Sequence, residues 1–401
     1  MFGLSAIECF IAIVLIFIVL YWITPRKAAW LPMLVTVILL SILAFNIQPN
    51  DSDDLSRYFT QLDYLREYGY DYLKRCFEDN VNGSNWGTYK TCGYYFYFMS
   101  MLPDNHWMPT ITIFITYGLM FLVLYKAANR FDVNKLYLFG GAMIFLSTYW
   151  YYDTYSGIRN GLTFAVIFAC SYYHLVERKR IPLCYVGYFL ACFMHSSGIM
   201  MVALALLAVF TLNNSGKFMN FLLVFGLVAG GALMQFLASR TDNTFIQTIA
   251  GQAEKHQAGE TLELGTMFTV NISMYILTAV LVFYFSIYIL NSEYGSEFKR
   301  FYKYCSIVLY FMFGCLYSGI IFHRIARWIV PMIAAIFFMV GSQCQNRYIQ
   351  KNDIAYCKYY APKNELIRYR TKPILNTAVV VYTAVHFWYL LNGSSLYWMH
   401  F

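Results

Sequence analysis

Apolar runs near 20 residues recur along the whole chain and are separated by short polar segments. As a helix, each run is long enough to cross ~30 Å of hydrocarbon. The pattern predicts an all-α, polytopic transmembrane bundle of about twelve helices, forming one integral-membrane domain over residues 1–401. The predicted helices cover 5–23, 29–47, 109–126, 136–151, 158–176, 181–194, 197–212, 218–238, 265–290, 303–321, 325–343 and 373–391.

Three segments between these runs are longer than simple connectors: 48–108, 240–263 and the basic segment 344–372. Within the first, Leu55 to Leu73 carries apolar and aromatic residues at helical spacing, which predicts an amphipathic helix at the interface. The aromatic stretch 93–102 is too short to span. Cys76 and Cys92 share this loop, and they either form a disulfide or remain two free thiols.

Composition supports a membrane protein, because 59% of the residues are apolar and only 12% are charged, whereas soluble domains carry roughly 25% charged residues. The 37 Tyr and 35 Phe suit interfacial belts, a cavity that stacks on sugar rings or isoprenoid chains, or lipid-facing bulk. The net charge of +8 needs no nucleic acid to explain it. Phosphate-binding loops and metal-ligand spacings do not stand out, so we expect no cofactor and no metal.

Charge alternates between successive loops, and 19 of the 29 Lys and Arg residues fall in one set. The positive-inside rule places that set in the cytoplasm, together with segment 344–372. Loops 48–108 and 240–263, and both termini, then lie on the external side. The basic set comprises Arg26, Lys27, Lys126, Arg130, Lys135, Arg178–Arg180, Lys217, Lys299, Arg300, Lys303 and the Lys and Arg residues of 347–372.

Two ionisable residues sit at the external edge of apolar runs, where such side chains are costly and are functional candidates. Arg159 begins a helix after Ser156-Gly157, and its forked guanidinium suits a phosphate. The alternative is an Arg that snorkels to the headgroups. His195, before Ser196, suits acid or base chemistry, or it is a capped, hydrogen-bonded core residue.

A second basic cluster, His323-Arg324-Ile325-Ala326-Arg327, falls on the same predicted side. Arg324 and Arg327 are three residues apart and share a helix face. They would repel each other unless an anion, or acids from the loops, lay beside them.

Asn50 to Asp54 is an acidic cluster that follows the second helix. A carboxylate there suits deprotonation of a sugar hydroxyl or a divalent metal. The alternative is an N-terminal cap for the amphipathic helix. Asp54 is also a candidate to orient Arg159 or Arg327.

Four stretches resemble the EpsG-type branch of the Wzy-like polysaccharide polymerases. They are GIRNGLTFAVIFACSYYHLVERK from Gly157, LACFMHSSGIMM from Leu190, Asp54 to Tyr58, and RIARWIVPM from Arg324. The resemblance implies catalytic roles for His195, Arg159 and Asp54. It also implies diphosphate binding by Arg159, Arg324 and Arg327, and substrate contacts from Tyr58, Ser196 and His323. Segment 48–108 is long and aromatic for the family, and His323 has no family counterpart.

The same resemblance implies a metal-independent glycosyltransferase of the bacterial inner membrane, with its site facing the periplasm or exterior. Its substrate would be an undecaprenyl-diphosphate-linked oligosaccharide repeat unit, with the lipid diphosphate as leaving group. Membrane lipid and a chain-length regulator protein are the other candidate partners.

Two other classes share some of these features. A lipid-linked oligosaccharide flippase or polysaccharide exporter would show two related halves and charges deep in several helices, and neither is visible in the sequence. A membrane O-acyltransferase would also place a His near one membrane face.

Overall fold

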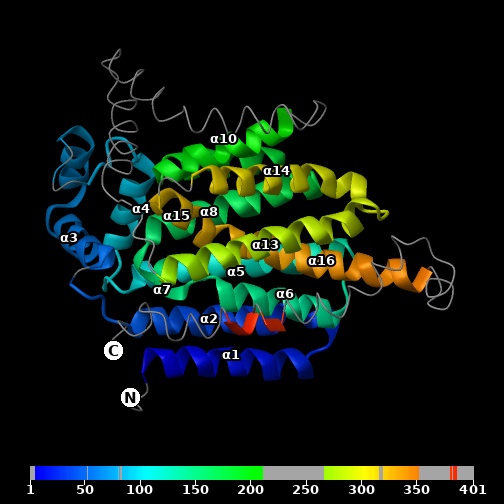
Figure 1. Cartoon of the computed structure of the whole chain (residues 1–401). Helices are drawn as coiled ribbons and strands as arrows, with labels where there is room; N and C mark the ends of the chain where they lie inside the picture. The colour runs from blue at the N-terminus through cyan, green and yellow to red at the C-terminus, as the bar shows by residue number, and fades with distance from the viewer. Residues whose placement is uncertain are drawn as a thin grey trace.

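The computed structural model describes residues 5–51, 53–79, 81, 84–210, 266–315, 319–351, 380–381 and 383–385. Over these residues the chain is all-helical and has no strand. Predicted helix 218–238, loop 240–263, and most of helix 373–391 and of segment 344–372 lie outside the described residues. Figure 1 shows long helices running side by side across one bundle.

The bundle begins with α1 (Ala6–Ile23) and α2 (Trp30–Asn46), which form one edge of the view in Figure 1. α1 packs on α2, and α2 packs on α5 (Trp107–Arg130). α6 (Lys135–Thr148) and α13 (Thr266–Leu290) both pack on α16 (Val330–Lys351).

The region that carries most of the predicted site packs as a second group of helices. α8 (Ile158–Tyr172) contacts α5, α9 (Ile181–Cys192) and α10 (Ser196–Phe210), and α10 contacts α14 (Gly295–Gly314). A π-helical turn, Tyr173–Glu177, extends α8 toward the basic turn before α9. The helices predicted at 181–194 and 197–212 are therefore α9 and α10, joined by a turn that ends at His195.

Three of the described helices are long and apolar enough to cross a membrane: Ala6–Ile23, Arg26–Asn46 and Trp107–Arg130. A fourth candidate is the pair Phe322–Trp328 and Val330–Tyr348, which is bent by 41°. Shorter apolar helices lie at Lys135–Thr148, Ile181–Cys192, Ser196–Phe210 and Tyr275–Leu290.

Two predicted boundaries are wrong. The helix predicted at 303–321 is α14 and begins at Gly295, because buried Phe298 and Phe301 already follow helical spacing among the charges that suggested a loop. The helix predicted at 325–343 is split into α15 (Gly319–Trp328) and α16, which break at Ile329. Pro331 lacks the N–H that would bond the Arg327 carbonyl, so it favours a break there.

Segment 48–108 folds over one end of the bundle, beside the short helices α7 (Tyr151–Ser156) and α15 (Figure 1). The predicted amphipathic helix is α3 (Asp54–Asp79), which buries Leu55, Leu62 and Leu65 against the core. The aromatic stretch forms α4 (Lys90–Ser100). Cys76 and Cys92 are buried free thiols and form no disulfide.

Candidate active site

Arg159 lies in the first turn of α8 and points at α3. Its Nε donates a hydrogen bond of 3.0 Å to the hydroxyl of Tyr58, and its guanidinium lies 5.5 Å from the centre of the Tyr58 ring. Tyr58 stacks edge-on against Phe96 of α4, so the loop helices fix the phenol that holds the arginine. The Tyr58 hydroxyl carries no charge, so this hydrogen bond does not neutralise the positive charge of Arg159.

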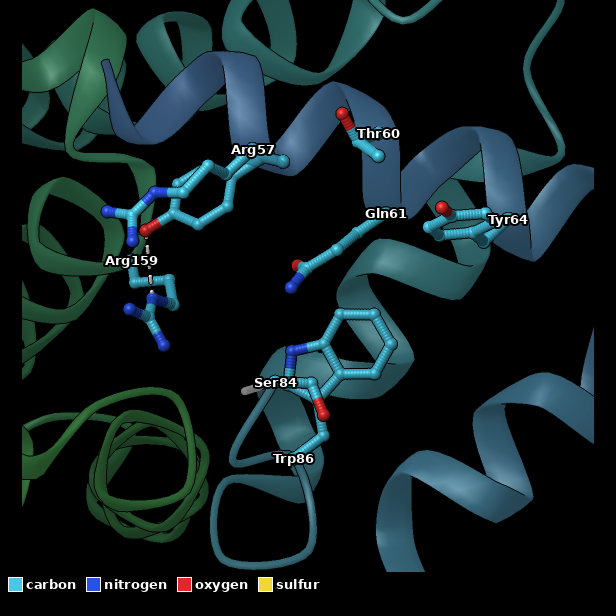
Figure 2. A pocket seen from close by; sticks show the side chains of 8 residues that line it. Arg57, Thr60, Gln61, Tyr64, Ser84, Trp86 and Arg159 are labelled. Atoms are coloured by element: carbon cyan, nitrogen blue, oxygen red, sulfur yellow. Dashed lines mark hydrogen bonds between the residues drawn. The ribbon is translucent and has the colours of Figure 1, made fainter. Parts of the chain in front are cut away.

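A cavity of about 280 Å³ opens beside Arg159, between α3 and the segment that carries Ser84 and Trp86. Figure 2 shows the side chain of Gln61 extending from α3 into this space, with Trp86 opposite. We call it the aromatic cavity. It is lined by Arg57, Tyr58, Thr60, Gln61, Tyr64, Ser84, Trp86 and Arg159.

A second cavity, of about 320 Å³, gathers the late basic cluster and the early acidic cluster, which lie far apart in the sequence. We call it the arginine cavity. Asp54 of α3 and His323 of α15 both line this cavity, so the fold brings together two residues that the sequence analysis named as candidates. It is lined by Asp54, Asp153, Ser156, Gly157, Asn160, His323, Arg324, Arg327 and Trp328.

Arg327 is neutralised by an acid in this second cavity. Its Nη1 donates to Asp153 Oδ2 over 3.1 Å, and its guanidinium lies 4.6 Å from the centre of the Trp150 ring. Burial raises the pKa of Asp153, while the positive charge of Arg327 opposes that rise. The sequence allowed Arg327 either to bind an anion or to pair with an acid from the loops. The geometry favours the pairing.

Arg324 has a different environment, although it is only three residues away. Its helix, α15, packs on α8, and it lies in the electrostatic field of Arg159 and of Tyr58, the residue that Arg159 contacts. Among the described residues, neither Arg159 nor Arg324 forms an ion pair with a carboxylate. Two partly buried cations held near each other without an acid create a strong positive potential, which an anion would relieve.

His195 caps α10 from the turn that precedes it. The backbone N–H of Ser197 donates to His195 Nδ1 over 3.1 Å, and the Ser197 hydroxyl lies 2.8 Å from the same nitrogen. The ring is buried and stacks on Tyr89 at 6.2 Å between ring centres. Because Nδ1 accepts a hydrogen bond, a neutral ring carries its proton on Nε2. The sequence analysis gave two alternatives for His195, a catalytic residue or a capped, hydrogen-bonded core residue. This geometry is that of the capped residue.

The residues around His195 nevertheless extend to the arginine cavity on one side and to Arg159 on the other. The Ser197 hydroxyl donates to the Asn160 side-chain oxygen over 3.4 Å, and Asn160 lines the arginine cavity. Tyr89 lies within hydrogen-bonding reach of Ser196 and in the field of Arg159. Burial raises the pKa of the neighbouring Cys92 thiol to about 11, while Arg159 opposes that rise.

Asp54 begins α3 and pairs with Arg57 one turn later, so it does not orient Arg159 or Arg327 through an ion pair. Its side chain is 46% exposed. The neighbouring Asp53 accepts a hydrogen bond from Tyr152 of α7, which ties the acidic cluster to the bundle. Asp54 therefore lies in the first turn of α3 and also lines the arginine cavity.

Sequence reasoning missed several residues that line the cavities, including Gln61, Trp86, Asp153 and Asn160. Asn160 follows Arg159 in the otherwise apolar start of α8, and that position was a readable signal. Asp153 was also readable, as an acid isolated between two apolar runs.

The fold and the site define an all-α membrane protein with a cationic, aromatic-walled site at one end of its bundle. The EpsG family matches residues 29–362, and the chain belongs to this family. EpsG is a Wzy-like polysaccharide polymerase family, so the chain has the coarse character of a membrane-embedded, glycosyltransferase-like polymerase of polysaccharide biosynthesis. No curated protein and no solved structure matches the chain.

Proposed function

We propose that this protein joins oligosaccharide repeat units that are linked to undecaprenyl diphosphate, and that Arg159 and Arg324 hold the diphosphate. One observation carries the proposal: Arg159 and Arg324 lie on the contacting helices α8 and α15, each lines a cavity at the same end of the bundle, and neither has a carboxylate partner among the described residues. A diphosphate supplies the missing charge, and each guanidinium can donate two parallel hydrogen bonds to it. Arg327, already paired with Asp153, acts mainly by holding α15 against α7.

The chemistry is a glycosyl transfer in which an acceptor hydroxyl attacks the anomeric carbon of the lipid-linked chain. The bond from that carbon to the phosphate oxygen breaks, and the lipid diphosphate leaves with the bonding electrons. Negative charge on the leaving oxygens grows in the transition state, where fixed guanidinium groups stabilise it most. No bound metal is required in this scheme.

The acceptor proton needs a base, and Asp54 is the better placed of the two predicted candidates. It lines the same cavity as Arg324, whereas His195 Nδ1 already accepts the Ser197 N–H. Tyr58, Ser196 and His323 remain predicted substrate contacts around this path.

We place the site at the outward face of the bacterial inner membrane. The support is the charge pattern, because the basic loops gather on the opposite side of the predicted topology. Undecaprenyl-linked repeat units would reach the arginine cavity from that leaflet, and a chain-length regulator would meet the enzyme there.

The test uses the variants Arg159→Lys and Arg324→Lys. Each keeps the positive charge but loses the two parallel N–H donors of the guanidinium. We expect each to reduce polymer formation about a hundredfold, as removal of one preorganised donor does in other enzymes. Polymer length is measured on gels, and unpolymerised lipid-linked units are measured by mass spectrometry. Arg130→Lys is the matched control, since Arg130 pairs with Glu297, away from both cavities. Wild-type polymer from both site variants would overturn the proposal.

A further inference from the structure

Three tyrosines of α3 form a compact cluster next to the aromatic cavity. The ring centres of Tyr64 and Tyr72 lie 5.6 Å apart, those of Tyr64 and Tyr68 lie 6.5 Å apart, and those of Tyr68 and Tyr72 lie 6.4 Å apart. Each ring therefore contacts the other two. Tyr64 itself lines the cavity that contains Arg159 (Figure 2).

A glycine makes this cluster. In an unbroken helix, residues 64 and 72 would be ~12 Å apart along the axis. Gly69 interrupts α3 with φ 62° and ψ −145°, a conformation open almost only to glycine. The break turns the second part of α3 so that Tyr72 reaches back to Tyr64.

The cluster presents aromatic surface to the outside. Tyr72 is buried, but Tyr64 is 37% and Tyr68 is 48% exposed. Two hydrogen-bonding side chains, Thr60 and Gln61, line the aromatic cavity together with Tyr64. Aromatic faces carry negative charge and attract the polarised C–H groups of a pyranose ring, while amides and hydroxyls bond to its hydroxyl groups. This combination matches a carbohydrate.

Charge argues against a lipid headgroup as the occupant. α3 contains six acidic and four basic residues, so it lacks the basic excess that attracts anionic lipid. Continuity with the aromatic cavity argues for a glycan whose reducing end sits at the arginines. The tyrosines then meet sugar rings further along the same chain.

We propose that Tyr64 and Tyr68 form a glycan subsite that stacks on sugar rings of the bound oligosaccharide and holds it during repeated transfers. This inference rests on the proposed function, from which it takes the position of the diphosphate at Arg159. It adds the direction of the glycan, from Arg159 outward along α3.

The test compares Tyr68→Ala, Tyr68→Phe and Tyr70→Ala in the full-length protein. Tyr70 is the matched control because it lies on the same helix, is 51% exposed and packs on Tyr97 instead. The probe is oligosaccharide released by mild acid from the polysaccharide of the producing cells, with binding followed by saturation-transfer NMR. We expect Tyr68→Ala to weaken binding about fivefold and to shorten the polymer, while the other two variants match wild type.

The outcomes separate the two proposals. Loss of polymer in the arginine variants, with binding and length unchanged in Tyr68→Ala, overturns the glycan subsite alone. Binding that depends on Tyr68, in a protein that joins no repeat units, overturns the proposed function but supports the subsite. Tyr68→Trp in vesicles with doxyl-labelled lipid gives a third result, because quenching of its added fluorescence would assign the cluster to the bilayer and overturn the subsite.

Discussion

At the scale of single residues, the chemistry of the site depends on which arginine finds an acid. The i, i+3 spacing predicted that Arg324 and Arg327 share a helix face, and both line the arginine cavity. Spacing could not reveal that Asp153, 174 residues earlier, pairs with Arg327 and not with Arg324. Ion pairs between distant segments are set by packing, which leaves no local pattern in the sequence.

His195 shows a similar limit, because its position at a helix start is readable and its partner atoms are not. We expect His195→Ala to destabilise the protein by about 1 kcal/mol, since the Ser197 N–H loses its acceptor. His195→Asn supplies another acceptor at the same place, so it should restore the thermal midpoint and polymer formation. Both quantities are measured on the purified variants and in cells. A stable His195→Asn protein that accumulates single lipid-linked units would instead assign the imidazole a chemical role.

At the scale of elements, apolar runs predicted the helices well wherever the run was uninterrupted, as in α1, α2 and α5. Prediction failed where a helix carries charges on its first turns, as in α14, or where a proline breaks a continuous apolar run, as before α16. The hydrophobicity of a segment indicates that it is buried in lipid or protein. It does not indicate where the backbone hydrogen bonds of a helix begin or end.

Close helix packing gives a prediction at this scale. A Cβ on Gly341 of α16 would lie 2.4 Å from Cβ of Phe285 on α13. Gly341→Leu should therefore force these helices apart and cost about 1–3 kcal/mol or more. Gly118→Ala is the control, because its nearest neighbour would be 4.0 Å away. Thermal unfolding in detergent should show a lower midpoint for Gly341→Leu only, and equal midpoints would contradict the packing described here.

At the scale of the whole molecule, the fold unites residues 54, 159 and 324 at one end of the bundle, which no single stretch of sequence shows. The family resemblance implied that these three residues belong to one site, and the structure shows which cavity each of them lines. The opposite end carries its own ion pairs, Arg130 with Glu297 and Arg347 with Asp132 and Glu293. The cavity end has ion pairs too, such as Arg327 with Asp153, but it also holds two partly buried arginines, Arg159 and Arg324, that form no ion pair with a carboxylate among the described residues.

That asymmetry makes the orientation of the bundle testable. Asp104 lies on the cavity side with a side chain 49% exposed, and Lys179 lies in the basic turn after α8 with a side chain 69% exposed. We expect an impermeant maleimide to label Asp104→Cys on intact cells, beyond the unmodified parent, because the positive-inside rule puts that side outward. Lys179→Cys should react only after permeabilisation. The reverse pattern would place the arginines in the cytoplasm, where an enzyme of outward-facing, lipid-linked glycans could not reach its substrate.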